Sequence, residues 1–91
     1  MNFSYLASFD KSLKGLPRSQ IDKIEKAIEK FITFFEAHEQ PKGLGIKKLR
    51  YDFWELRVGL EYRIIFVLRG NNIYFVFAGT HDDIKRFIKN L

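Results

Sequence analysis

The sequence predicts a small α+β domain in which an antiparallel sheet carries two helices on one face, followed by a short C-terminal helix. Three observations lead to this prediction. The chain has 91 residues, which suffice for one core and one domain. Apolar residues follow a helical period in the first half and form strand-like runs between short turns in the second half. Ten Phe, four Tyr and one Trp supply much of the core.

The first segment predicts a strand and then a short helix. Apolar and polar residues alternate over residues 2–8, as they do in an amphipathic strand. A helical turn is expected over Asp10–Lys14, closed by Gly15 and by Pro17, which favours a break before it.

A longer amphipathic helix is expected from about Ser19 to about His38. Ser19 is a plausible N-cap, with Asp22 in capping-box position. Residues 40–45 have the composition of a loop. Five apolar residues of the helix recur every three or four positions and predict one core-facing stripe. They are Ile21, Ile24, Ile28, Phe31 and Phe35.

The second half predicts four strands and one helix, joined by short turns. The last helix begins at Asp82 or Asp83 and reaches Asn90, with apolar residues at helical spacing. The expected strands are Ile46–Arg50, Phe53–Val58, Tyr62–Arg69 and Ile73–Gly79.

The register of the central hairpin follows from matching apolar faces, because a slip of one residue would turn the apolar set outward. Val58 should lie opposite Tyr62, which places Arg57 directly opposite Arg63. Two arginines that face each other across a ladder repel, and an anion would relieve that repulsion.

The register of the last hairpin rests on its turn. Asn71–Asn72 suits a tight two-residue turn because asparagine tolerates the left-handed conformation. This turn pairs Arg63 with Thr80. His81 then follows directly, where the chain leaves the sheet.

Charge and composition narrow the class of protein. The net charge is +5, and the segment from Lys42 to Arg69 carries +4 of it, which suggests a polyanionic partner. The absence of cysteine excludes disulfides, thiol catalysis and cysteine zinc sites, and it fits a reducing compartment. The N-terminus lacks a secretory signal, and the longest apolar run is the six residues Ile73–Ala78, so we expect a cytoplasmic protein that does not cross a membrane.

The candidate catalytic residues are Arg57, Arg63, His81 and Glu55. Guanidinium groups suit phosphate oxygens, and an imidazole titrates near neutral pH, so the first three form a candidate site for phosphate chemistry. Glu55 points to the same face and is either a general base or an ion-pair partner. Five further basic residues could extend a track for a nucleic-acid backbone: Lys42, Lys47, Lys48, Arg50 and Arg69.

Structural alternatives stand beside this interpretation. One alternative is that Arg57 pairs with Glu55 or Glu61 on a solvated sheet face. His81 is equally a helix-start residue beside Thr80, which would be the N-cap. The two histidines share no ligand spacing with each other or with a carboxylate cluster, and no glycine-rich phosphate loop occurs, so we expect neither a metal nor a cofactor.

The sequence resembles the RelE/ParE superfamily of toxins from bacterial and archaeal toxin–antitoxin pairs. The most specific part is Trp-Glu-Leu-Arg-Val-Gly followed shortly by Tyr-Arg-Ile-Ile. The matching segments are Tyr5–Pro17, Lys48–Gly59, Tyr62–Phe66 and Gly79–His81.

The resemblance implies a microbial-RNase-like fold and a ribosome-dependent, metal-independent endoribonuclease of the RelE/YafQ-like branch, which cuts mRNA and inhibits translation. Carried over by position, Arg57 and Arg63 would hold the scissile phosphate and His81 would be the general acid. The implied partners are mRNA on the ribosome and a cognate acidic antitoxin.

The chain departs from the family pattern at two positions. Glu55 stands where some members carry a lysine, and Lys85 stands where some carry an aromatic residue. The ParE branch shares the fold and inhibits DNA gyrase instead. The alternative function is therefore a ParE-like gyrase inhibitor or a catalytically silent antitoxin-binding module.

Overall fold

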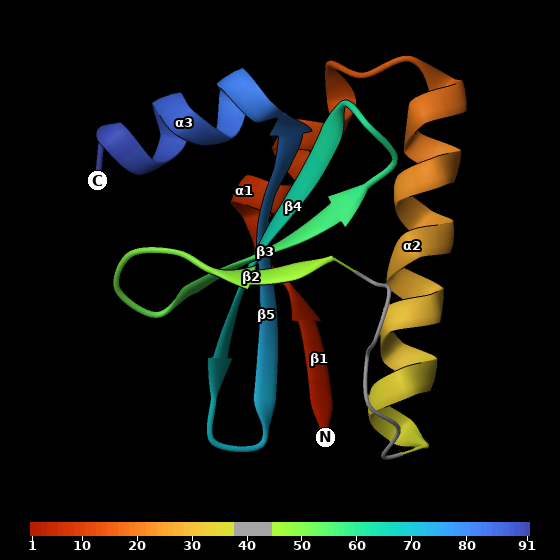
Figure 1. Cartoon of the computed structure of the whole chain (residues 1–91). Coiled ribbons are helices and arrows are strands. Elements are labelled where there is room, and N and C mark those ends of the chain that lie inside the picture. The colour runs from red at the N-terminus through yellow and green to blue at the C-terminus, as the bar shows by residue number, and fades with distance from the viewer. Residues whose placement is uncertain (38–44) are drawn as a thin grey trace.

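The computed structural model describes residues 1–37 and 45–91 as a sheet with helices on both sides (Figure 1). The predicted order of elements, β-α-α-β-β-β-β-α, is confirmed. The elements are β1 (Asn2–Tyr5), α1 (Ala7–Lys14), α2 (Arg18–Glu36), β2 (Ile46–Lys48), β3 (Phe53–Val58), β4 (Tyr62–Arg69), β5 (Asn72–Thr80) and α3 (His81–Lys89).

The described strands form one sheet in the order β1-β5-β4-β3-β2. The pairs β2–β3, β3–β4 and β4–β5 are antiparallel, whereas β1 runs parallel to β5. The prediction of a purely antiparallel sheet is therefore wrong at this edge. Hairpin turns force neighbouring strands to be antiparallel, but β1 reaches β5 only through the rest of the chain, so no turn dictates its direction.

Two apolar clusters lie on the two faces of the sheet. The larger cluster joins α1 and α2 to the sheet through Phe9, Phe31 and Phe75, among others. The smaller cluster joins α3 to the opposite face, around Ile65 and Ile84. Figure 1 shows α2 beside one face and α3 beside the other. The prediction that the two N-terminal helices share a face is confirmed.

The apolar stripe of α2 packs on the sheet as predicted, with Ile24, Ile28 and Phe31 buried. The predicted N-cap is wrong: Pro17, not Ser19, precedes the helix, and no side chain caps it. The carbonyl of Pro17 accepts the first backbone hydrogen bonds of the helix, so the helix begins one residue earlier. No helix within residues 1–37 or 45–91 is long and apolar enough to span a membrane.

The first strand is shorter than predicted, because α1 begins where alternation still suggests a strand. Beyond Tyr5, the edge of β5 is paired by serine side chains instead of by β1. The Ser8 hydroxyl donates to the carbonyl of Val76 at 2.5 Å, and the Ser12 hydroxyl accepts the N–H of Ala78 at 2.9 Å. Ser8, from the expected strand, and Ser12, from the expected helix, thus satisfy backbone groups of β5.

The turn between β4 and β5 consists of Gly70 and Asn71, one residue earlier than predicted, and Arg69 pairs with Asn72. Gly70 has φ +58°, a conformation that glycine adopts without a steric penalty. The predicted register of this hairpin, with its turn at Asn71–Asn72, is therefore wrong.

A β-bulge changes the register again along β5, with Val76 as the extra residue. Because of the bulge, Val76 and Phe77 both contact the cluster beside α3, which strict alternation would forbid. Arg63 consequently lies opposite Gly79 instead of Thr80.

Among the remaining strands and helices, some bounds agree with the predicted ones and others differ by a few residues. β3 and β4 have the predicted bounds, and β5 gains one residue at each end. β2 ends at Lys48, before Arg50, because the chain turns over residues 50–53, where Tyr51 has φ +56° and the Phe53 N–H donates to the Arg50 carbonyl. α3 begins at His81, earlier than the predicted start.

We expect Ser12→Ala to lower the free energy of unfolding by about 1–2 kcal/mol, because the buried edge of β5 would lose the acceptor for the Ala78 N–H. Urea denaturation measures this change. Ser19→Ala is the matched control, since Ser19 is exposed and no side chain caps α2. Equal stability of the two variants would contradict the role assigned to Ser12.

Candidate functional site

The predicted pairing of the central hairpin is confirmed: Val58 lies opposite Tyr62, and Arg57 lies opposite Arg63. Side chains alternate along a strand, so both arginines point to the face of the sheet opposite the buried Leu56. This is the face on which α3 packs. Gly79 on β5 continues the row beside Arg63.

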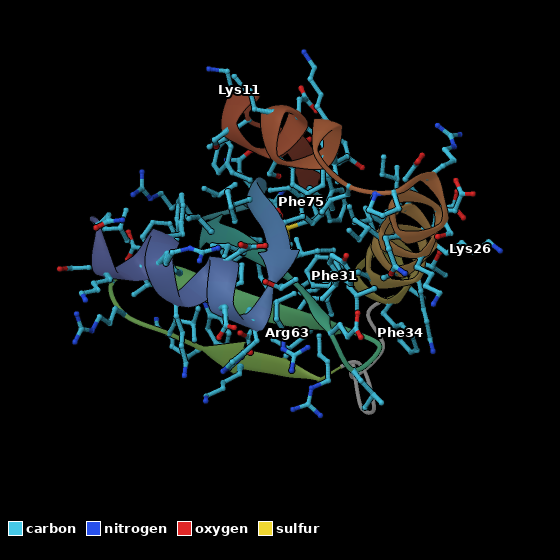
Figure 2. All side chains as sticks on the ribbon, turned by 90° about the horizontal axis from the view of Figure 1, so that it is seen from above. Lys11, Lys26, Phe31, Phe34, Arg63 and Phe75 are labelled. Carbon is cyan, nitrogen blue, oxygen red and sulfur yellow. The ribbon has the colours of Figure 1, made fainter. Side chains whose placement is uncertain are left out.

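Arg63 is a buried charged residue whose guanidinium contacts two backbone carbonyls and one carboxylate. Its Nη1 donates to the carbonyl of Tyr62 at 2.9 Å and to that of Leu60 at 3.4 Å. Its Nε lies 3.8 Å from Oε2 of Glu55, and the two side chains are only 10% and 12% exposed. Figure 2 shows Arg63 between the sheet and α3, away from the apolar core. The hairpin therefore holds this guanidinium in one position before any ligand arrives.

Glu55 is the ion-pair partner of Arg63, which is one of the two roles that the sequence left open. The carboxylate balances the positive charge that the sheet buries. Removing either partner would leave the other charge buried and uncompensated, which is strongly destabilising.

Arg57 is exposed, in contrast to Arg63. Its stem is covered by Gly45, whose carbonyl accepts the Arg57 N–H at 3.1 Å. A Cβ built on Gly45 would lie 3.0 Å from that of Arg57, and the φ of Gly45 is +68°, so glycine suits this position. Among the described residues Arg57 forms no ion pair, and the alternative pairing with Glu55 or Glu61 is wrong.

His81 is the first residue of α3, and its helix-start position is confirmed together with the Thr80 N-cap. The Thr80 hydroxyl accepts the Asp83 N–H at 3.2 Å, and the Asp83 carboxylate accepts the Thr80 N–H at 2.9 Å. The His81 N–H donates to the carbonyl of Glu61 at 3.2 Å, which ties the start of α3 to the β3–β4 turn. These bonds fix the backbone from which the exposed imidazole projects.

The electrostatics of this cap depend on Asp83. The hydrogen bond from the Thr80 backbone holds the pKa of the Asp83 carboxyl below its usual value, against a smaller opposing effect of burial. Arg86 also pairs with this carboxylate and favours the charged form. The ionised carboxylate lies in the first turn of α3, where the helix dipole favours negative charge.

A groove of about 520 Å³ lies between α3 and the β2 arm, which is the segment from Ile46 to Arg50. Glu55 lies at the sheet side of the groove, and three apolar side chains, Leu49, Ile84 and Ile88, form its apolar lining. Five basic or titratable side chains border it: Lys47, Arg50, His81, Lys85 and Lys89.

The groove gathers only some of the basic residues predicted to bind RNA. Lys47 and Arg50 line it, whereas Lys48 lies over the Trp54 ring on the other face of the sheet, with its Nζ 5.1 Å from the ring centroid. Arg69 pairs with Asp52 at 3.1 Å, at the end of β4 far from Arg63. The structure thus does not bring Lys48 or Arg69 to the candidate site. Lys42, like His38, lies outside the described residues.

Lys85 and Lys89 belong to the groove, yet their position did not follow from the sequence reasoning on RNA binding. With His81 they occupy positions i, i+4 and i+8 of α3, which form one stripe along a helix. This spacing is the sequence signal from which the basic stripe could have been predicted. Most of the net charge lies in the segment from Lys42 to Arg69, so the lysines of α3 do not stand out by charge alone.

Candidate metal ligands do not gather in the described part of the chain. Within residues 1–37 and 45–91 no group of three or more His, Cys, Asp or Glu side chains is placed to hold a metal ion. The chemistry that the described site itself offers is cationic: a fixed guanidinium, an exposed guanidinium opposite it, an imidazole and a basic groove.

Neither a family model nor a curated protein sequence matches this chain. Solved structures do match over nearly its whole length. A chain of the RelB–RelE antitoxin–toxin complex from Methanococcus jannaschii is 25% identical, with a TM-score of 0.70 and coverage of 91% of this chain and 95% of that chain.

Two bacterial structures extend the comparison. A chain of the DinJ–YafQ complex from E. coli is 17% identical, with a TM-score of 0.68 over 91% of this chain and 96% of that chain. A metal-bound toxin from Helicobacter pylori is 19% identical, with a TM-score of 0.73 over 92% of this chain and 98% of that chain. The chain therefore has a RelE-like toxin fold, and the resemblance seen in its sequence is confirmed.

We expect Asp83→Asn to lower the free energy of unfolding by about 1 kcal/mol at pH 7, because it weakens the cap of α3. The folded-state pKa of Asp83 is depressed, so its contribution is present above the unfolded pKa and is lost as pH falls through the folded pKa. The difference between wild type and variant should therefore shrink toward zero in acid.

Urea denaturation at a series of pH values measures this difference. Asp82→Asn, which makes the same change at an exposed position in the same turn, is the control. A stability difference for Asp83→Asn that is constant across the acid range would show that the carboxylate charge is irrelevant.

Proposed function

We propose that this chain is the toxin of a toxin–antitoxin pair and an endoribonuclease that cleaves mRNA on the ribosome. The observation that carries the proposal is the pair of facing arginines beside His81 and the basic groove. Arg63 is preset by Glu55 and the hairpin carbonyls, while Arg57 is exposed opposite it. The RelE-like fold and the toxins that share it support the same proposal.

The proposed reaction is attack of a ribose 2′-hydroxyl on the adjacent phosphorus. The new bond closes a 2′,3′-cyclic phosphate while the bond to the 5′-oxygen breaks. His81 donates a proton to that leaving oxygen, and a base takes the proton of the 2′-hydroxyl. Arg63 stabilises the negative charge that accumulates on the phosphate oxygens, with Arg57 binding from the opposite strand.

Glu55 has a positioning role in this proposal. Its carboxylate lies against the Arg63 guanidinium and also lines the groove. Glu55 therefore orients Arg63 toward the phosphate through this ion pair.

The same basic surface suits the proposed acidic antitoxin. Structural neighbours include toxins solved together with antitoxins, namely RelE with RelB and YafQ with DinJ. An acidic segment laid along the groove would neutralise its cations and exclude RNA at the same time. Inhibition would then follow from occupancy, without a conformational change in the toxin.

We expect expression of the wild-type chain to arrest growth with cleavage of mRNA, and His81→Ala to lose the cleavage. Mapping mRNA 5′ ends after induction measures both effects. His81 is exposed, so the variant should keep the wild-type melting temperature. Codon-phased cleavage that survives the substitution would remove His81 from the mechanism; arrest with altered DNA supercoiling and no cleavage would favour a ParE-like gyrase inhibitor.

Substituting each arginine in turn should separate an effect on cleavage from an effect on stability. Arg57→Ala should lower the cleavage rate with little change in melting temperature, because Arg57 is exposed. Arg63→Ala should lower both, with a loss of about 3 kcal/mol in the free energy of unfolding, because it leaves Glu55 buried without its partner. The double variant Arg63→Ala/Glu55→Ala should recover part of that stability without recovering cleavage.

Thermal denaturation and mRNA end mapping of the three variants distinguish the roles. Recovery of cleavage in the double variant would contradict the assignment of Arg63 to the phosphate. An Arg57→Ala variant that cleaves at the wild-type rate would show that the exposed arginine contributes nothing to the site.

A further inference from the structure

The wall of the groove formed by α3 carries cations that the proposed cleavage chemistry does not use. Lys85 and Lys89 line the groove together with His81, and both are exposed. None of the ion pairs among the described residues includes either lysine. Their charges are therefore available to a ligand in the groove.

The opposite wall carries a matching pair of cations. Lys47 and Arg50 belong to the β2 arm and line the same groove, and they also take part in none of the ion pairs of the described chain. Between the two walls lie apolar side chains, including Ile84 and Leu49. The groove thus has basic rims and an apolar lining.

The spacing along α3 sets the length of the basic row. A helix rises about 1.5 Å per residue, so the stripe from His81 to Lys89 extends for about 12 Å. Each strand of stacked nucleic acid carries one phosphate per about 3.4 Å. The row is therefore long enough to meet phosphates beyond the one held at Arg63 and His81.

We infer that Lys85 and Lys89 form a second phosphate subsite, which binds the backbone of single-stranded RNA on one side of the scissile phosphate. This inference rests on the proposed function, because it takes the position of the scissile phosphate from it. The basic rims hold the backbone, and the apolar lining receives the base faces that only an unpaired strand exposes. A duplex would bury those faces in its own stack and would contact the rims alone.

An RNA strand fits the row better than an acidic peptide does. Its charges repeat at short, regular intervals and begin at the phosphate held by Arg63 and His81. The carboxylates of a peptide have no such starting point. The substrate class assigned to the subsite is therefore a single-stranded polyribonucleotide, with little dependence on sequence at the phosphates that Lys85 and Lys89 contact.

The test is equilibrium binding of the full chain to a short single-stranded RNA whose 2′-hydroxyls are methylated, so that it cannot be cleaved. Lys85→Ala/Lys89→Ala is compared with Lys11→Ala/Lys14→Ala, which removes the same charge from exposed positions of α1. Figure 2 shows Lys11 pointing outward from α1, on the far side of the molecule from α3. Binding is measured over a range of salt concentrations.

We expect the α3 variant to bind the RNA more weakly and to lose about 1.4 from the magnitude of its log–log salt slope, since each contacted phosphate of a single strand contributes about 0.7. The α1 variant should bind like the wild type. In cleavage assays the α3 variant should show a raised KM with nearly unchanged kcat.

Two outcomes would overturn the subsite. One is an α3 variant with the wild-type salt slope and affinity. The other is loss of affinity for an acidic peptide without loss for RNA, which would assign the row to a protein partner. Because the probe cannot be cleaved, the two proposals can fail separately. If the wild-type chain does not cut mRNA but the α3 variant still shows the expected loss of slope, the nuclease is refuted and the subsite stands.

Discussion

The pairing of β3 with β4 is the constraint on which the rest of the structure depends. One register places Leu56 and Val58 against the core beneath α1 and α2, and it places Arg57, Arg63 and Glu55 on the opposite face. A slip by one residue would bury the charges and expose the core. The hydrophobic effect that stabilises the sheet therefore also fixes the two arginines opposite each other. The repulsion between them is tolerated because Glu55 and the hairpin carbonyls compensate Arg63. The positions of the charged groups are thus a by-product of core packing.

Sequence patterns were sufficient to predict an element or a register where only one arrangement buries its apolar residues. The stripe of α2 and the bounds of β3 and β4 follow from periodicity, and the register of the central hairpin follows from parity. The prediction for the last hairpin was wrong for two local reasons. The turn is Gly70–Asn71 instead of Asn71–Asn72, and a bulge at Val76 interrupts the alternation. The alternation of apolar and polar residues also predicted Ser8 as a strand residue, but Ser8 lies in α1. Its hydroxyl bonds to Val76 of β5, which is 68 residues away in the sequence. Long-range backbone pairing leaves no trace in a short window of sequence.

The same contrast between local patterns and long-range contacts applies to the residues of the candidate site. The pairing of Arg57 with Arg63 follows from a short hairpin whose register parity fixes, whereas Gly79, not Thr80, lies beside Arg63 two residues before His81. Lys48 and Arg69 were assigned by charge alone. The structure turns Lys48 to Trp54 and gives Arg69 a carboxylate partner, because side-chain direction and local pairing decide where a charge is available. Net charge predicts a polyanionic partner without placing it, whereas the location of the groove depends on the packing of α3 against the sheet.

The serine bonds to β5 bear on how the chain is made. Ser8 and Ser12 are 68 and 66 residues away from the backbone groups that they satisfy, and β1 pairs with the same distant strand. During synthesis the first segment consequently has no sheet to join until β5 has left the ribosome. Contacts of such sequence separation close late and slow the folding of a small domain. The groove is completed later still, since α3 follows β5, so a partly synthesised chain would lack its arginine–histidine site. The topology therefore delays the appearance of the candidate site until α3 has been translated.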